Sequence, residues 1–249
     1  MLLIVTPNYK GEVPVLAKTA SALGWDIYNR GWRIPVHLLR SPGAVYGEQF
    51  FCEVIAEQMN WNLLSNPLDW LAKLPEEYVN RKITFTTLAE ARKINEKKFI
   101  KPADDKCFPA QVYESGNDLP KHVVLDNTPT LVSDVVNFTS EYRCFIKDRK
   151  VTTACCYLYK HYGKEPEINN PANYYQNNDL VLEFMTKLLA DERVECAPGS
   201  VIDVGRCKKD DEALKFVVLE TNPVYASGTY GCEMVAVLDA INAACVPNK

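Results

Sequence analysis

The first third of the chain alternates between two kinds of apolar spacing. Some apolar runs are short and continuous, which is typical of buried strands. Others place an apolar residue every three or four positions and end near glycine or proline, which predicts amphipathic helices. The Asn66-Pro67 pair predicts one more helix start, because asparagine caps helices and proline fits their first turn. The predicted strands are 2–6, 34–39 and 62–64, and the predicted helices are 14–24, 46–59 and 67–75.

This order of elements predicts a small parallel α/β domain at the start of the chain. From about residue 80 the pattern changes to neighbouring strands joined by charged turns, such as 148–150 and 208–212, which predicts antiparallel hairpins. We therefore expect an α/β domain followed by a region of α+β class. The strands predicted for that region are 83–86, 98–102, 110–113, 131–138, 142–147, 151–159, 201–204 and 216–219, and the helices are 88–94, 178–189 and 231–244.

Composition narrows the function classes. The chain has 249 residues, and its net charge of −4 is spread without a basic stripe, so nucleic acid is not an expected partner. The first apolar run is too short for a signal peptide, and no run approaches the roughly 18 residues of a membrane span. Nine cysteines without C-x-x-C spacing favour reduced thiols over disulfides or zinc. We expect a cytoplasmic protein with no membrane partner.

Three polar side chains near a predicted hairpin suit a divalent cation. Asp203 interrupts an apolar run, where an unpaired carboxylate would be costly. Glu220 and Asn222 lie two positions apart on the partner strand and so share a face, which Asp203 can meet across the ladder. Their oxygens are the kind that Mg²⁺ prefers. The alternative is a set of ordinary solvated acids beside a hairpin.

Basic residues elsewhere suit phosphate. Lys101 ends an apolar strand at a Lys-Pro pair, and Lys106 follows five residues later. Glu141 and Arg143 alternate along a strand, so both can face one cleft. Each of these also matches an ordinary surface residue when it is taken alone. The glycine-containing segment 223–231 leads into the last predicted helix, and it suits either an anion at backbone N–H groups or a flexible connection.

The order of these motifs resembles the ATP-grasp superfamily over residues 80 to 235: Lys-Pro at 101–102, Glu-x-Arg at 141–143, an Asp, then Glu-x-Asn-Pro at 220–223. The stretch containing Trp70, Leu74, Pro75 and Arg81, with Glu141 and Arg143, resembles a clade of short bacterial and phage members named for two arginines and a lysine. The resemblance implies a substrate-side α/β domain at 1–79 and an ATP-grasp domain at 80–249. That domain divides into a small lobe at 80–130 and a large lobe at 131–249.

The resemblance also implies roles for single residues. Lys101 is expected to contact the phosphates of ATP, and Glu141 to bind the ribose hydroxyls. Arg143 and Arg206 are candidates for the transferred phosphate or acyl oxygen. Hinge residues whose backbone would read adenine are Val132, Ser133, Asp134 and Val135, and the implied Mg²⁺ ligands are Asp203, Glu220 and Asn222.

Two departures from the family pattern matter. The segment 103–111 has no glycine, whereas relatives cradle phosphate there with a glycine-rich loop, so we expect Lys106 to supply a side-chain charge instead. Val201 stands where many ligases have an arginine two residues before the first magnesium aspartate, so Arg206 is expected to take over that role.

The function implied by the resemblance is that of an ATP- and Mg²⁺-dependent ligase. It would join a carboxylate of a small molecule or peptide to an amine through an acyl phosphate. Two alternatives remain open at this point: an ATP-grasp kinase that phosphorylates a small molecule, and a nucleotide-binding module without catalysis.

Overall fold

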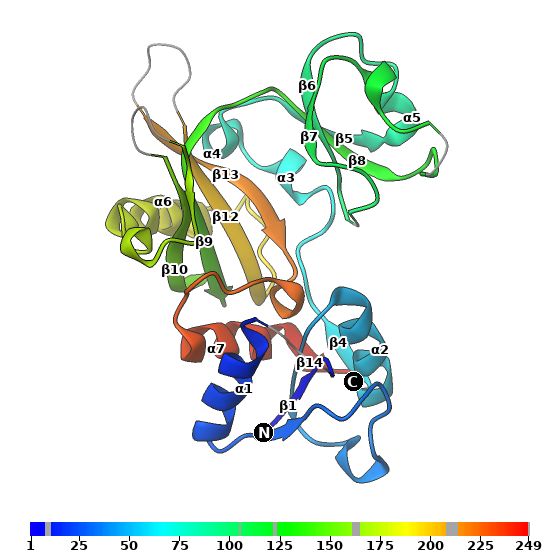
Figure 1. Ribbon diagram of the computed structural model, residues 1–249, viewed down its shortest axis with the longest axis vertical. Coiled ribbons are helices and arrows are strands. Elements are labelled where there is room, and N and C mark those ends of the chain that lie inside the picture. The colour runs from blue at the N-terminus through cyan, green and yellow to red at the C-terminus, as the bar shows by residue number, and fades with distance from the viewer. Residues whose placement is uncertain (8–10, 105, 122–123, 161–164, 208–213, 249) are drawn as a thin grey trace. The chain divides into compact units, whose positions relative to one another are not determined.

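The computed structural model describes residues 1–7, 11–104, 106–121, 124–160, 165–207 and 214–248. The charged turn predicted at 208–212 lies outside these residues. The chain divides into two compact units (Figure 1). Unit 1 comprises residues 1–66, 139–204 and 220–249, and unit 2 comprises residues 67–138 and 205–219. The three-part division expected from the sequence stays a prediction. Among the described residues, no helix combines the length and apolar character that crossing a membrane requires.

Unit 1 contains a parallel three-stranded sheet in the order β2-β1-β3, formed by Leu2–Val5 (β1), Asp26–Tyr28 (β2) and Gly43–Tyr46 (β3). The strand predicted at 34–39 is wrong, because this run straddles Pro35, which has no N–H to donate. Residues Val36–Leu38 form a 3₁₀ turn, and Val36 is 85% exposed. The predicted helices correspond to Val13–Ala22 (α1) and Gln49–Met59 (α2).

The next predicted elements pair differently from expectation. The third strand, Trp61–Leu63 (β4), pairs antiparallel with Cys245–Pro247 (β14) and not with the parallel sheet. Asn66 does not cap a helix: its side chain bonds to Thr221 and to the backbone of Ala197. Short helices follow at Trp70–Lys73 (α3) and Glu76–Val79 (α4).

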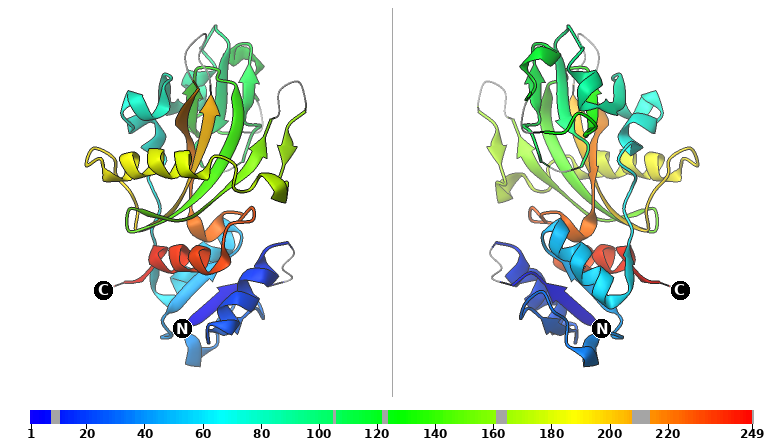
Figure 2. Two further views of the ribbon diagram at one scale, coloured as in Figure 1. Left: turned by 90° about the vertical axis from the view of Figure 1, so that its left-hand side faces the viewer. Right: turned by 90° about the vertical axis from the view of Figure 1, so that its right-hand side faces the viewer.

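A five-stranded sheet forms the second part of unit 1, in the order β11-β10-β9-β12-β13. The predicted hairpin of β9 and β10 is confirmed, with the two strands antiparallel. Helix Asn178–Ala190 (α6) lies across this sheet (Figure 2). Helix Met234–Ala244 (α7) packs on both sheets, so Ile4, Phe145 and Val237 belong to one hydrophobic core. The strands are Phe138–Lys147 (β9), Lys150–Tyr159 (β10), Glu167–Ile168 (β11), Gly199–Cys207 (β12) and Lys215–Asn222 (β13).

Unit 2 is built on an antiparallel sheet in the order β5-β8-β6-β7. Helix Leu88–Ala91 (α5) packs on one face, where Leu88, Ile100 and Val132 form a core. Because strand residues alternate, Lys101 and its cross-strand neighbour Leu131 belong to the other face. The strands are Ile83–Thr87 (β5), Lys98–Pro102 (β6), Gln111–Tyr113 (β7) and Pro129–Ser133 (β8).

Candidate active site

A buried ion pair lies at the centre of the candidate site in unit 1. Arg143 on β9 meets Asp203 on β12 in a two-pronged contact: Nε donates to Oδ1 at 2.9 Å, and Nη2 donates to Oδ2 at 2.7 Å. The side chains are 7% and 0% exposed. The fork of a guanidinium matches a carboxylate in this way and holds it in a fixed orientation.

Burial and charge act on this pair in opposite directions. Burial raises the pKa of Asp203 to about 6, although the Arg143 charge and its hydrogen bonds favour the ionised carboxylate. Burial alone would lower the pKa of Arg143, but the charge of Asp203 and the bonds to it raise that pKa overall. Arg143 therefore stays charged, and the ionised form of Asp203 depends on a nearby cation.

Glu220 and Asn222 on β13 join this pair. The Asn222 Nδ2 atom donates to Asp203 Oδ2 at 3.3 Å and to Glu220 Oε1 at 3.0 Å. The convergence predicted from strand alternation is therefore confirmed, while the metal-binding role stays a prediction. The described residues include no group of three or more His, Cys, Asp or Glu side chains that could hold a metal ion. Any cation here would be held by two carboxylates and an amide.

The donor set fits Mg²⁺ on one observation. The Nδ2 group of Asn222, which carries partial positive charge, bridges two carboxylates that would otherwise repel each other. A cation between the carboxylates would take over that role, and rotation of the amide would present its oxygen as a ligand.

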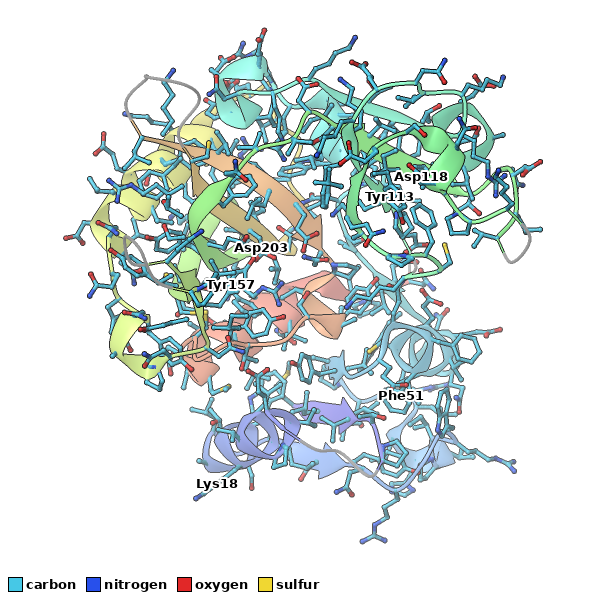
Figure 3. The ribbon with its side chains drawn as sticks, turned by 45° about the horizontal axis from the view of Figure 1, so that its top comes forward. Lys18, Phe51, Tyr113, Asp118, Tyr157 and Asp203 are labelled. Carbon is cyan, nitrogen blue, oxygen red and sulfur yellow. The ribbon has the colours of Figure 1, made fainter. Side chains whose placement is uncertain are left out.

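Glu141 lies on the same face of β9 as Arg143 and bonds to Tyr157. The Tyr157 hydroxyl donates to Glu141 Oε2 at 2.6 Å. The pairing of β10 with β9 is irregular between Cys156 and Leu158, and this bulge directs Tyr157 toward the site. Burial raises the pKa of Glu141. Figure 3 labels Tyr157 and Asp203, and the charge of Asp203 also helps to raise the pKa of Tyr157, after burial.

A loop before α7 completes the surroundings of Arg143. The Nη1 group of Arg143 donates to the Gly228 carbonyl at 2.9 Å, and the Tyr230 ring lies 4.3 Å from the centre of the guanidinium. Tyr157 and Tyr230 are 5.0 Å apart between ring centroids. Sequence reasoning missed both tyrosines, because no local pattern marks either of them.

The predicted phosphate-binding lysines belong to unit 2. Lys101 lies on the sheet face away from α5, which also carries Phe85 and Leu131. Phe85 is 38% exposed. A cation beside exposed apolar surface is suited to a nucleotide, which offers a flat base and a charged phosphate chain. Lys106 is exposed and follows residue 105, which lies outside the described part of the chain.

The predicted hinge residues divide into two kinds. Val132 and Ser133 lie inside β8, which is bonded on both sides by β5 and β6, and the Val132 side chain packs into the α5 core. The Asp134 backbone N–H donates to the Lys82 carbonyl. Val135 follows the strand and is 40% exposed. Of the four residues, the position of Val135 best suits backbone bonds to a base.

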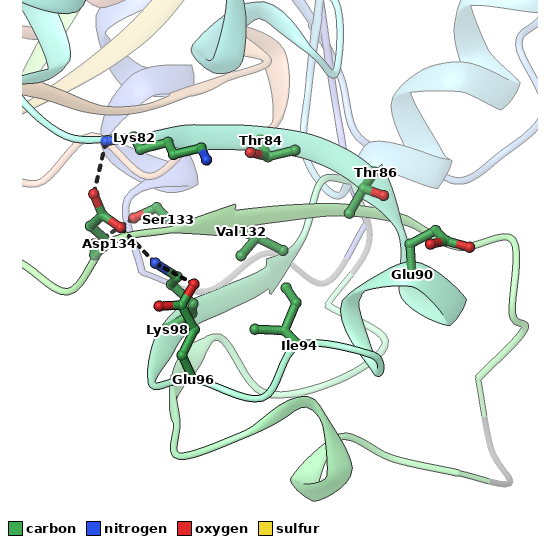
Figure 4. Close-up of a pocket in the computed structure, with 10 residues that line it drawn as sticks. All are labelled: Lys82, Thr84, Thr86, Glu90, Ile94, Glu96, Lys98, Val132, Ser133 and Asp134. Carbon is green, nitrogen blue, oxygen red and sulfur yellow. Dashed lines mark hydrogen bonds and ion pairs between the residues drawn. The ribbon is translucent and has the colours of Figure 1, made fainter.

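A pocket of about 250 Å³ opens beside this hinge in unit 2 (Figure 4). Lys98 crosses one end of it and bonds to Asp134 at 2.8 Å and to Glu96 at 3.1 Å. Thr84 and Val132 line the pocket, and both belong to the α5 face of the sheet. The pocket is therefore on the opposite face from Lys101, and it is not the surface expected to hold the phosphates.

Arg206 does not join Arg143. The two residues Asp203 and Arg206 are three positions apart on β12, so their side chains leave opposite faces of the strand. The guanidinium of Arg206 lies 5.9 Å from the Phe216 ring centre. Arg81, from the stretch that resembles the clade, is buried and donates to the carbonyls of Val79 and Val218. Burial lowers its pKa to about 10.

Comparison with known proteins places this geometry in context. Over residues 78–240 the sequence matches the model of an ATP-grasp domain, family 2 of the clade named for two arginines and a lysine. A search of curated proteins found no match.

Three solved structures share the fold at low sequence identity. A RimK domain ATP-grasp protein from Sphaerobacter thermophilus DSM 20745 is 15% identical, with 97% of this chain and 98% of that chain covered and a TM-score of 0.50. The D-alanine–D-alanine ligase of Bacillus anthracis complexed with ATP is 14% identical, with 98% and 96% covered and a TM-score of 0.51. N5-carboxyaminoimidazole synthase from Aspergillus clavatus, in complex with ADP and a ribonucleotide, is 11% identical, with 97% and 76% covered and a TM-score of 0.54.

Proposed function

This chain belongs to family 2 of the ATP-grasp clade named for two arginines and a lysine, and on that premise we propose that it is a ligase that uses Mg-ATP to join a carboxylate to an amine. The expected partners are a small molecule or peptide with a carboxylate, and an amine. Solved ATP-grasp structures of similar fold include a ligase in complex with ATP, which is consistent with this proposal.

The observation that carries the proposal is the buried cluster of Arg143, Asp203, Glu220 and Asn222. A buried guanidinium beside two carboxylates combines a site for a phosphoryl or acyl oxygen with ligands for a hard cation. Mg²⁺ held by Asp203, Glu220 and Asn222 would offset the charge of the polyphosphate. A purely structural cluster has no need for this combination, since a buried ion pair is costly to keep.

The residues of unit 2 suit the nucleotide itself. Lys101 would contact the phosphates, and Val135 at the end of β8 would contribute backbone groups to the adenine. We keep Lys106 as the second phosphate contact, because the segment without glycine offers few alternatives. In unit 1, Glu141 would accept hydrogen bonds from the ribose hydroxyls, and Tyr157 holds its carboxylate in place.

The proposed reaction has two steps. First, a carboxylate oxygen of the substrate attacks the γ-phosphorus of ATP, so that ADP leaves and an acyl phosphate forms. Next, the amine attacks the acyl carbon, phosphate leaves, and the amine loses a proton. Arg143 would hold an oxygen that gains charge in these steps, so the protein contributes positioning and electrostatic stabilisation. Arg206 is a weaker candidate for the same role, because it leaves the other face of β12.

A kinase is the alternative that the same cluster supports, since the first step alone transfers a phosphoryl group. Product analysis distinguishes the two. We would screen amino acids, short peptides and other carboxylates, each with and without an amine, for release of ADP, and identify the products by mass spectrometry. A condensed product with phosphate supports the ligase. A stable phosphorylated product supports the kinase, and no ADP release from any combination contradicts both.

A further inference from the structure

Glu12, at the start of α1, is bonded to the loop that surrounds Arg143. Its two carboxylate oxygens accept hydrogen bonds from successive backbone N–H groups, those of Thr229 and Tyr230, the latter at 2.7 Å. These residues lie 217 and 218 positions away from Glu12 in the sequence. The segment 223–231 therefore does bring N–H groups to an anion, but the anion is a side chain of this same chain.

The loop held by Glu12 reaches Arg143 in two ways. The Gly228 carbonyl accepts a hydrogen bond from Arg143, and the Tyr230 ring covers the guanidinium at 4.3 Å. Asp203 holds the other edge of the guanidinium. Arg143 is thus fixed between a carboxylate from the sheet and a loop whose backbone is held by Glu12.

The loop needs an external hold. Tyr230 has a φ of +48°, a left-handed conformation that non-glycine residues rarely adopt unless their surroundings impose it. The side chain of Thr229 does not supply the hold, because its buried Oγ1 atom has no hydrogen-bond partner among the described residues. Tyr46 on β3 adds one bond, from its hydroxyl to the Ser227 carbonyl at 2.7 Å.

We infer that Glu12 is a positioning residue for Arg143, acting through the backbone of Thr229 and Tyr230. The inference rests on the proposed function, because Arg143 is assigned there to the transferred phosphate. It gives α1 a task in the site: the helix carries the carboxylate that keeps the Tyr230 ring against the guanidinium. Loss of this carboxylate should affect ligands that reach Arg143 and spare those that do not.

Glu12→Gln tests the inference with little change in volume. An amide has only one acceptor oxygen and turns N–H toward N–H, so one of the two loop bonds is lost. Hydrogen exchange followed by mass spectrometry should show faster exchange at residues 228–231. Calorimetry should show Mg-ATP affinity falling about fivefold, while AMP, which lacks the γ-phosphate, keeps its affinity within about twofold.

Controls separate positioning from loss of folding. Glu183→Gln removes an exposed surface carboxylate from unit 1 that pairs with Lys187, and it should change neither exchange at 228–231 nor affinity. Glu12→Ala should regain slow exchange and Mg-ATP affinity when acetate is added, since a free carboxylate can occupy the N–H pair.

Equal losses of ATP and AMP affinity in Glu12→Gln would overturn the inference, and so would unchanged Mg-ATP affinity. Both results would leave the proposed function standing. A wild-type chain that does not bind Mg-ATP would overturn the proposed function and the inference with it.

Discussion

Replacing Arg143 by methionine should destabilise the protein strongly, because it leaves the Asp203 carboxylate buried without its cation. The carboxylate is 0% exposed and loses two charge-assisted hydrogen bonds at 2.9 and 2.7 Å. Breaking a buried ion pair from one side typically costs about 3–5 kcal/mol. The Tyr230 ring and the Gly228 carbonyl also lose their partner. For a chain of this size, the expected fall in the melting temperature is about 6–20 °C.

The assay is thermal and urea unfolding in EDTA, so that no bound cation replaces the guanidinium. Asp203→Asn should also be costly, because it leaves Arg143 buried without a counter-charge. The double variant should be more stable than the sum of both single losses, by a coupling of at least about 1 kcal/mol. A loss below about 1 kcal/mol in Arg143→Met, as for an exposed pair, would refute the buried pair.

The loss should also depend on pH, with a definite sign. The pKa of Asp203 is raised in the folded protein to about 6, so its protonated form favours folding at low pH and that contribution is lost as pH rises through the folded pKa. Without Arg143 the folded pKa rises further. The variant should therefore lose more stability relative to wild type at pH 8 than at pH 5, and a loss independent of pH would contradict this reasoning.

Three predictions concern the nucleotide and its cation. Lys101→Ala should weaken Mg-ATP binding at least about tenfold by calorimetry, while Lys97→Ala, at an exposed ion pair with Glu114, should not; equal affinity in both would place the phosphates elsewhere. Glu220→Gln and Asn222→Ala should abolish turnover and keep the wild-type far-ultraviolet circular dichroism, and near-normal ADP release in either would remove that residue from the metal site. Lys106→Met should lower kcat much more than it raises the KM for ATP, and Lys106→Arg should restore only part; a wild-type kcat in Lys106→Met would end its assignment.

The parts of the site that were predictable are those set by short-range strand geometry. Asp203 interrupts an apolar run, and Glu220 and Asn222 alternate on the next strand, so their convergence follows from the two-residue period of a hairpin. The face of Lys101 follows in the same way once its register with Leu131 is known. The elements most easily predicted, such as Lys98–Pro102 and Asn178–Ala190, combine a clear period with clear ends.

The rest depends on contacts that no local pattern records. Glu12 reaches Tyr230 across 218 positions of sequence, and Tyr157 is aimed at Glu141 by a bulge that the alternating strand pattern conceals. The predicted strand at 34–39 failed because apolar residues around Pro35 are not all buried. Arg206 was chosen by nearness in sequence to Asp203, whereas strand alternation sends the two side chains to opposite faces.

The central claim, activation of a carboxylate by ATP, is tested most directly by following the oxygen of that carboxylate. The substrate that gives a condensed product would be labelled with ¹⁸O in its carboxylate and incubated with the amine and Mg-ATP, and the released phosphate would be analysed by mass spectrometry. Passage through an acyl phosphate predicts one ¹⁸O atom in each phosphate released. Phosphate without label, formed together with the condensed product, would contradict the account.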